Sequence, residues 1–284
     1  RLKAERKAGL RHDRLAGKTL GMIFAKSSTR TRISFEVGMM QLGGQALYLN
    51  AQDIQLGRGE SVSDTARVLS RFIDAIMIRT FAHQDVLDLA EYGSIPVING
   101  LTDLMHPCQA LADLMTIREH KGRLRGLKLA YLGDGNNVAN SLLQACARAG
   151  MDIAVASPAG YTCDPACIAD SQAEAQRQGC SVVLTDDPLI AAAGADILYT
   201  DTWVSMGQEA EKAARISIFS RYQVNDGIMA AAAPGAIFLH CLPAYRGLEV
   251  SASVIDGPAS VVFDEAENRL HAQKAVLLQL LAPQ

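Results

Sequence analysis

Hydroxyl and guanidinium side chains are concentrated in the segment Ser28-Thr-Arg-Thr-Arg32. The apolar run before it, residues 19–25, predicts a buried strand, and Ser27 or Ser28 can cap the helix that follows by accepting a hydrogen bond from a backbone N–H group. A helix N-terminus attracts anions through its free N–H groups and its dipole. So many donors exceed what capping needs, but they suit a phosphate, whose oxygens accept several hydrogen bonds at once. Taken alone, the segment also fits a capped helix with solvated arginines.

Further polar side chains follow other predicted strands. Residues 74–79 form a short apolar run that ends in Arg79. His106 precedes a proline suited to the first helical position, and Gln109 lies one turn away, so both can face the same ligand. Parallel sheets bind ligands at the carboxyl ends of their strands. We therefore expect one cleft between two domains, lined by the polar clusters at residues 27–31, 99–109, 133–137, 201–207 and 240–243.

Predicted strands and helices alternate along the whole chain, which indicates an α/β fold with mostly parallel sheets flanked by helices. A polar break at residues 121–126 separates two such runs. We therefore predict two domains, residues 1–122 and 123–264. On the helix that is predicted to begin after Ser28, an apolar face is shared by Ile33, Val37 and Met40. The predicted strands are 19–25, 46–49, 74–79, 95–98, 127–132, 152–156, 181–184, 196–199 and 236–239, and the predicted helices are 61–72, 84–92, 107–120, 138–149, 165–178 and 265–281.

Composition excludes several classes of protein. The 284 residues contain no apolar run of about 18, so we expect no membrane partner. A net charge of −3 gives no electrostatic basis for binding nucleic acid. No secretory-signal pattern opens the sequence. Six scattered cysteines form no disulfide framework and indicate a reducing, cytoplasmic compartment, and Cys163 and Cys167 lack a second ligand pair at zinc-site spacing.

Four segments together resemble the ornithine carbamoyltransferases, within the aspartate/ornithine carbamoyltransferase family. Any one of them is a weak match, but all four occur in the family's order and span both predicted domains. The resemblance implies transfer of the carbamoyl group from carbamoyl phosphate to the δ-amine of L-ornithine, which gives L-citrulline and phosphate. The segments are Ser28-Thr-Arg-Thr-Arg32, His106-Pro-Cys-Gln109, Asp201-Thr-Trp-Val-Ser-Met-Gly207 and His240-Cys-Leu-Pro243.

By this resemblance, the first domain binds carbamoyl phosphate. Arg79 would bridge the phosphate and the carbonyl oxygen, His106 would donate to that oxygen, and Gln109 would hold the carbamoyl amine. Arg269 would contact the phosphate, which implies that the last helix, 265–284, packs back on the first domain. Gln55 would reach the site of a neighbouring subunit, which implies a homo-oligomer, typically a trimer. The other residues expected at this site are Ser28, Thr29, Arg30, Thr31, Cys241 and Leu242.

The second domain would receive ornithine. Asn137 opens a predicted helix, where it is placed for the substrate carboxylate. Asp201 would bind the α-ammonium group, and Ser205 and Met206 would complete the pocket. Cys241 would contact the substrate amine and the carbamoyl group without forming a thioester, since no activating base is paired with it in the sequence. The residues expected to carry the chemistry are Arg30, Arg79, His106, Asp201 and Cys241.

The implied reaction needs no metal and no cofactor. The attacking amine must be uncharged, so we expect activity to rise above neutral pH. Alternative substrates are aspartate, putrescine and N-acetylornithine. Asp201 favours a free α-ammonium group, and aspartate would require further cations near Cys241, where the sequence offers only Arg246. A nicotinamide-dependent oxidoreductase is a second alternative, but Gly133-Asp-Gly135 lacks the third glycine of the dinucleotide pattern. A non-catalytic binding module is the third.

Overall fold

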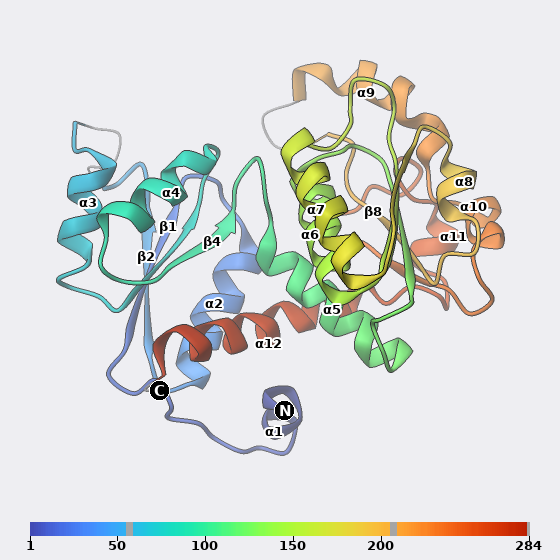
Figure 1. Cartoon of the computed structure of the whole chain (residues 1–284). Helices are drawn as coiled ribbons and strands as arrows, with labels where there is room; N and C mark the ends of the chain where they lie inside the picture. Colours follow the sequence, from blue (N-terminus) through green and yellow to red (C-terminus); the bar gives the residue numbers. More distant parts are fainter. Residues whose placement is uncertain (55–58, 205–208, 283–284) are drawn as a thin grey trace. The chain divides into compact units, whose positions relative to one another are not determined.

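The computed structural model describes residues 1–54, 59–204 and 209–282. The chain divides into two compact units. Unit 1 comprises residues 1–108 together with the C-terminal residues 267–284, and unit 2 comprises residues 109–266. Helix α5 (Pro107–Lys121) contains the first boundary between the units, and helix α12 (Val262–Leu281) contains the second (Figure 1).

Unit 1 is built on a four-stranded parallel sheet. Its strands lie in the order β2-β1-β3-β4, so the neighbouring strands β1 and β3 are not consecutive in the sequence. Pairing joins Phe24 to Arg79 and brings the carboxyl ends of β1 and β3 to the same edge. The strands are β1 (Thr19–Phe24), β2 (Gln45–Asn50), β3 (Ala75–Arg79) and β4 (Val97–Leu101).

Alternate side chains of these strands form two apolar layers. On one face, Met22 and Met77 pack with Phe35 of α2 and Leu277 of α12. On the other face, Ile23 packs with side chains of α3 and α4. The sheet is therefore covered on both faces, which explains its nearly continuous apolar strands. The helices of this unit are α1 (Leu2–Lys7), α2 (Thr29–Gln41), α3 (Val62–Leu69), α4 (His83–Tyr92), the start of α5 and most of α12.

Helix α2 buries a different face from the apolar one that its sequence indicates. Thr31, Phe35 and Met39 are buried, whereas Ile33 and Met40 are 52% and 67% exposed. The buried face combines the large side chains of Phe35 and Met39 with the small residues Ser34 and Gly38. Its Gly38 would place a Cβ only 3.4 Å from Lys274 Cγ.

Unit 2 holds a second parallel sheet, of five strands in the order β7-β6-β5-β8-β9. The chain reverses its direction of growth between β5 and β8, so the sheet has a switch point there, where the carboxyl ends of parallel strands bind ligands. The strands are β5 (Lys128–Leu132), β6 (Asp152–Ala156), β7 (Val182–Thr185), β8 (Ile197–Thr200) and β9 (Ile237–Leu239).

Helices cover both faces of this sheet as well. Tyr131 and Tyr199 stack on the face that packs against α5 and α6. Leu132 and Phe238 pack against α8, α10 and α11 on the other face. The helices are α6 (Asn137–Ala149), α7 (Pro165–Gln178), α8 (Pro188–Ala192), α9 (Lys212–Phe219), α10 (Asp226–Ala231) and α11 (Ala252–Ile255), with short 3₁₀ turns at Glu209–Glu211 and Ser220–Tyr222.

The predicted fold class is confirmed: two α/β units, each with a parallel sheet flanked by helices, and a C-terminal helix whose last part belongs to the first unit. All nine predicted strands are present. Most of their ends lie within two residues of the predicted ends. Helices α8 to α11 were not predicted. Within the described residues, no helix combines the length and the apolarity that crossing a membrane requires.

Candidate active site

The N-terminus of α2 forms a donor-rich turn in unit 1. Ser28 is the N-cap, and its side-chain oxygen accepts from the backbone N–H of Thr31 at 3.2 Å. The Thr31 hydroxyl is buried and accepts from Nη2 of Arg269 at 3.2 Å. Thr29 is exposed and Arg30 is half-buried. Residues 28–31 and a residue of α12, far apart in the sequence, therefore share one site.

His106 lies in the same unit, immediately before α5, and is buried. Burial and the nearby charges of Arg269, Arg79 and Arg30 hold the pKa of His106 well below its usual value. The imidazole is therefore neutral at physiological pH, and in that form it can donate one N–H without adding charge. Three guanidinium groups around one buried neutral histidine make a local excess of positive charge that favours an anion.

The loops that carry Arg79 and His106 are tied down locally. The Arg79 carbonyl accepts from the backbone N–H of Ala25 at 2.9 Å, which joins the ends of β3 and β1. Buried Lys26 donates to Asp103 at 2.6 Å. Thr102 accepts from the N–H of Met105 at 3.1 Å and so closes the turn before His106. These bonds fix the site on the sheet edge without using its arginine side chains.

Gln109 belongs to unit 2, although it lies only three residues after His106. Its side chain is buried. The amide nitrogen donates to Asp113 Oδ1 at 2.8 Å and to Glu265 Oε1 at 2.9 Å. Both carboxyl groups were absent from the predicted site.

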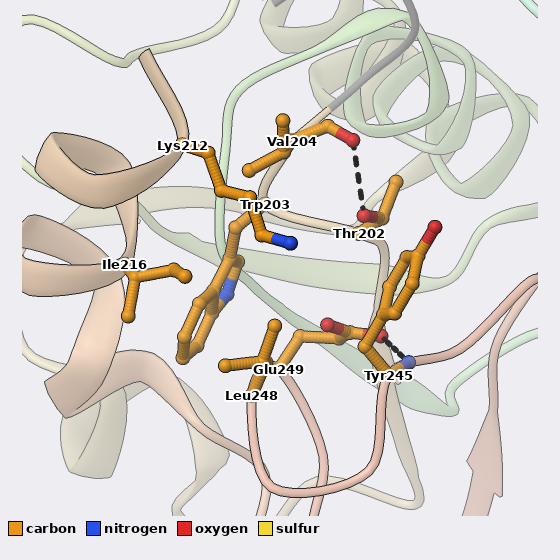
Figure 2. A pocket seen from close by; sticks show the side chains of 8 residues that line it. All are labelled: Thr202, Trp203, Val204, Lys212, Ile216, Tyr245, Leu248 and Glu249. Atoms are coloured by element: carbon orange, nitrogen blue, oxygen red, sulfur yellow. Dashed lines mark hydrogen bonds between the residues drawn. The ribbon is translucent and has the colours of Figure 1, made fainter. Parts of the chain in front are cut away.

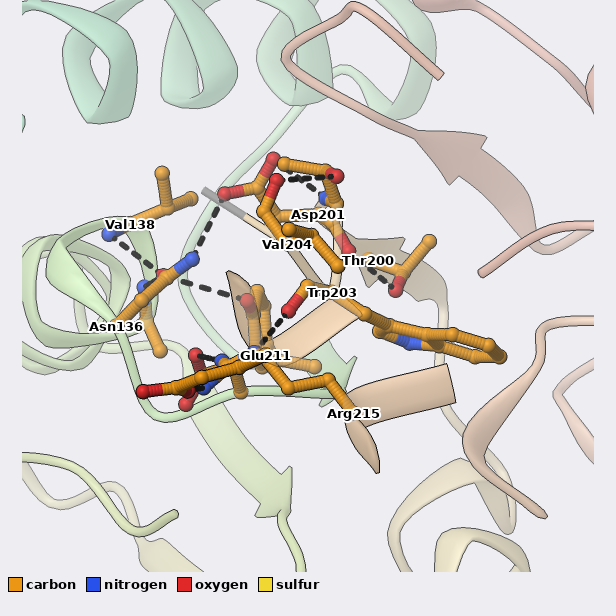
Figure 3. Close-up of polar contacts among 12 residues, drawn as sticks. Asn136, Val138, Thr200, Asp201, Trp203, Val204, Glu211 and Arg215 are labelled. Atoms are coloured by element: carbon orange, nitrogen blue, oxygen red, sulfur yellow. Dashed lines mark hydrogen bonds and ion pairs between the residues drawn. The ribbon is translucent and has the colours of Figure 1, made fainter. Parts of the chain in front are cut away.

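Asp201, directly after β8, is the centre of the polar group in unit 2 (Figure 3). Its carboxylate is buried and accepts from the N–H of Thr202 at 2.8 Å, from Asn136 Nδ2 at 2.8 Å and from the Cys241 thiol at 3.1 Å. Three donors fix its orientation, which is what an anion must have if it is to bind an ammonium group in one geometry.

Asn136 is a residue that the sequence reading missed in favour of its neighbour Asn137. Asn136 is the N-cap of α6, and its Oδ1 accepts from the backbone N–H groups of Val138 and Ala139 at 3.0 and 3.2 Å. The amide nitrogen of the same side chain donates a hydrogen bond to Asp201. Asn137 is the first helical residue. The capping preference of asparagine fits either position, so the sequence alone did not separate them.

Gly135, in the turn before α6, lies tightly against another segment of the chain. A Cβ on Gly135 would lie 2.2 Å from the backbone of Thr162 and Cys163. The glycine therefore serves close packing of two chain segments. Asp134 in the same turn pairs with buried Arg215 (Figure 3), and burial still raises the pKa of Asp134 to about 6.

Cys241 follows β9 and faces Asp201. Burial, and the negative charges of Asp201 and Glu265, raise the pKa of Cys241 well above the usual thiol value. The thiol is therefore protonated and donates its hydrogen to Asp201. A protonated thiol is a poor nucleophile. The prediction of a non-covalent Cys241 is thus consistent with its surroundings.

His240 braces the turn that carries Cys241 and Leu242. Its Nδ1 accepts from the Leu242 N–H at 2.9 Å, so Nε2 carries the hydrogen and faces Glu249 Oε1 at 3.3 Å. Ligand atoms of Asp201, His240 and Cys241 lie within 4.8 Å of one another, as metal ligands do. Both ring nitrogens of His240 are already engaged within the protein, however, which leaves neither for an ion.

A pocket of about 150 Å³ lies beside this group in unit 2 (Figure 2). It opens between the residues after Asp201, helix α9 and the loop after Cys241. Neither Asn137 nor Asp201 lines it. Its walls are mostly apolar, with one cation and one carboxylate, and consist of Thr202, Trp203, Val204, Lys212, Ile216, Tyr245, Leu248 and Glu249.

The structure thus groups the predicted residues in two sets. Ser28, Thr31, Arg30, Arg79, His106 and Arg269 form one set in unit 1. Asp201 and Cys241, with Leu242 next in the chain, belong to the set in unit 2. Gln55, Ser205 and Met206 lie outside the described residues. The common cleft stays a prediction.

Comparison with known proteins agrees with the motifs. The family description "Aspartate/ornithine carbamoyltransferase, carbamoyl-P binding domain" matches residues 1–119, and "Aspartate/ornithine carbamoyltransferase, Asp/Orn binding domain" matches residues 125–280. The chain belongs to the aspartate/ornithine carbamoyltransferase family. The resemblance of the four motifs is therefore confirmed.

Individual members of the family are similar over nearly the whole chain. The ornithine carbamoyltransferase of Symbiobacterium thermophilum is 62% identical over 280 residues, which cover 99% of this chain and 90% of that protein. The one from Carboxydothermus hydrogenoformans is 59% identical with the same coverage. The solved structure of the Pyrococcus furiosus ornithine carbamoyltransferase has a TM-score of 0.96 and 57% identity, and the match covers 99% of this chain and 90% of that one.

Proposed function

We propose that this protein transfers the carbamoyl group from carbamoyl phosphate to the δ-amine of L-ornithine and releases L-citrulline and phosphate. The observation that carries the proposal is the placement of buried His106 among Arg30, Arg79 and Arg269 beside the N-terminus of α2. That set supplies backbone N–H groups, hydroxyls, guanidiniums and one neutral imidazole, which match a phosphate joined to a carbonyl. Relatives that are 59–62% identical carry the name ornithine carbamoyltransferase.

The proposed mechanism follows from these charges. Ser28, Thr29 and Thr31 hold the phosphate with Arg30 and Arg269. Arg79 and His106 donate to the carbonyl oxygen, whose negative charge grows as the δ-amine attacks the carbon. Preorganised donors of this kind usually supply the largest part of the acceleration, and each is worth about 2.7–4 kcal/mol. As the tetrahedral intermediate collapses, the bond between the carbonyl carbon and the phosphate oxygen breaks, and the proton lost by the attacking nitrogen leaves with the phosphate as hydrogen phosphate.

The amino acid is held by unit 2 in this proposal. Asp201, fixed by three donors, binds the α-ammonium group. Asn137, at the start of α6, faces the α-carboxylate, and Ser205 and Met206 complete the pocket. Cys241 remains a neutral thiol, so no acyl-enzyme forms.

Among other amines, ornithine fits best. Aspartate would need a cation for its second carboxylate. Arg246 is bound by Asp256 through two hydrogen bonds of 2.8 and 2.6 Å on the surface, and Lys212 lines the neighbouring pocket, which Asp201 does not line. Putrescine has no α-carboxylate, and N-acetylornithine has no α-ammonium group for Asp201.

We further propose a homotrimer with shared sites. The exposed apolar residues Ile33 and Met40 of α2, together with Leu47 and Tyr48 of the edge strand β2, offer a surface for a second copy of the chain. Gln55 follows that strand and would reach the neighbouring site. We also propose that the enzyme is cytoplasmic, since all six cysteines are free. We propose further that it acts in arginine metabolism.

Titration with carbamoyl phosphate tests the proposed site. We expect Arg30→Gln to weaken binding by about 100-fold, because one desolvated charge-assisted contact is worth roughly 1.5–3 kcal/mol. Arg32→Gln is the matched control, since Arg32 is two residues away, half-exposed and paired with Glu36 at 3.0 Å. Equal losses in both variants, or binding of NAD in place of carbamoyl phosphate, would refute the assignment.

A further inference from the structure

A cluster of buried polar groups lies behind Gln109 in unit 2. The amide nitrogen of Gln109 donates to Asp113 Oδ1 at 2.8 Å and to Glu265 Oε1 at 2.9 Å. Glu265 Oε1 also accepts from the Tyr199 hydroxyl at 3.1 Å, and its Oε2 accepts from the backbone N–H of His240 at 2.9 Å. All five residues are at most 1% exposed.

Glu265 therefore joins three separate parts of the unit. It lies near the start of α12 and contacts α5 through Gln109, β8 through Tyr199 and the end of β9 through His240. The residues it contacts are 156, 66 and 25 positions away in the sequence. Its position in the fold makes it the common acceptor of donors from all three.

The hydrogen-bond pattern fixes which way the Gln109 amide faces. An amide nitrogen has two hydrogens, and here each has an oxygen acceptor. If the amide were flipped, its oxygen would face two carboxyl groups. The nitrogen must therefore face Asp113 and Glu265, and the oxygen must face the opposite way. A carbamoyl amine offers only N–H donors, so the amide oxygen is the atom of Gln109 that can bind it.

The charge of the cluster suits this task. Burial, and then the charge and hydrogen bond of Asp113, raise the pKa of Glu265 well above its usual value. The higher pKa opposes ionisation of Glu265 beside Asp113, so the cluster resists holding two buried anions next to each other.

We propose that Glu265 is a positioning residue that, with Asp113, holds the Gln109 amide oxygen toward the carbamoyl amine. This rests on the proposed function. Glu265 does not touch substrate, and it acts only on the carbamoyl end of carbamoyl phosphate. Inorganic phosphate has no such end, so its binding is independent of Glu265.

Kinetics of Glu265→Gln test the proposal. The new amide would put an N–H group against either the His240 N–H or the donors of Gln109 and Tyr199, so the cluster must shift. We expect kcat/KM for carbamoyl phosphate to fall by about 10–100-fold, the usual effect of a misplacement near 1 Å. Inhibition by inorganic phosphate should be unchanged. Asp264→Asn is the matched control, because Asp264 is the adjacent acid on α12 but is 53% exposed and pairs with His120 at 2.9 Å on the surface.

A double-mutant cycle with Gln109→Ala separates positioning from general loosening. If Glu265 acts through Gln109, the Glu265→Gln change adds little once the Gln109 side chain is gone. Additive effects, parallel weakening of phosphate inhibition, or wild-type kinetics in Glu265→Gln would each overturn the proposal. If Glu265→Gln does not fold, Tyr199→Phe replaces it, with the same direction and a smaller loss expected. A wild-type protein that makes no citrulline would contradict the proposed function instead.

Discussion

At the scale of single residues, the site depends on which groups stay uncharged. His106 is neutral because burial and three arginines oppose its protonation. Cys241 is neutral because burial and two carboxylates oppose its ionisation. The guanidinium groups therefore carry the positive charge on the carbamoyl phosphate side, and Asp201 carries the negative charge on the ornithine side. The two neutral groups can donate hydrogen bonds without disturbing this division.

The state of the Cys241 thiol can be measured by alkylation. Since its pKa lies well above the usual thiol value, the reactive thiolate should be scarce up to pH 9. We expect iodoacetamide to modify Cys241 more slowly than free cysteine at every pH from 7 to 9, as followed by mass spectrometry of the peptide. Modification faster than free cysteine at pH 7 would show an activated thiolate and would contradict the non-covalent role.

The pH dependence of kcat/KM for ornithine should reflect the substrate. The attacking amine must be neutral, and its pKa resembles that of lysine, about 10.4. Below that pH, each unit increases the neutral fraction about tenfold. His106 does not oppose this rise, because its lowered pKa leaves it neutral throughout. We expect log kcat/KM to rise with a slope near one between pH 7 and 8.5, and a flat profile would count against amine deprotonation.

At the scale of elements, strand ends and helix starts place most groups of the site. Ser28 and Asn136 each cap a helix that begins directly after a strand of the sheet. The two caps differ in what else they do. Ser28 accepts from the backbone of its own helix, whereas Asn136 also donates to Asp201.

The double role of Asn136 can be isolated with a matched cap. Asn225 caps α10 with the same pair of backbone bonds, at 3.0 and 3.2 Å, and within the described part of the chain its side chain bonds only to its own helix. Asn136→Ala and Asn225→Ala should each lower the free energy of unfolding by about 1 kcal/mol in urea. Only Asn136→Ala should also raise KM for ornithine, because Asp201 loses a donor. A similar ornithine KM in the two variants would argue against the role of Asn136.

The sequence predicted those elements that are long enough to show a pattern. Strands such as Asp152–Ala156 and helices such as Pro165–Gln178 carry an unbroken apolar run or a proline start with a glycine end, and both were found at their observed bounds. Helices α8 to α11 have four to eight residues, too few for a period to repeat clearly. Their positions come from packing on the sheet, not from local propensity.

The parts of the site that the sequence did not predict have other causes. Glu265 acts through groups up to 156 positions away, and no local pattern reports such a contact. Asn136 was passed over for its neighbour because the two residues are chemically identical. The apolar stripe of Ile33 and Met40 can be recognised in the sequence. Its exposure cannot, because it arises when α2 packs its other face, which includes Gly38, against the rest of unit 1.

At the scale of the whole molecule, that stripe bears on assembly. An exposed apolar helix face beside an open sheet edge is costly in a monomer. We expect light scattering on a sizing column to give about 91 kDa, three times the chain mass of 30.4 kDa. Met40→Lys should lower that mass and reduce activity with it, since the sites would be shared. A monomeric, fully active wild type would refute the trimer.

The most direct measurement of the central claim is kcat/KM for carbamoyl transfer to ornithine, putrescine, aspartate and N-acetylornithine, with the carbamoylated product and phosphate followed together. The account predicts that ornithine is preferred over each of the others, that citrulline and phosphate form in equal amounts, and that Asp201→Asn loses most of the preference. Equal or greater transfer to putrescine or aspartate, or phosphate release without citrulline, would contradict it.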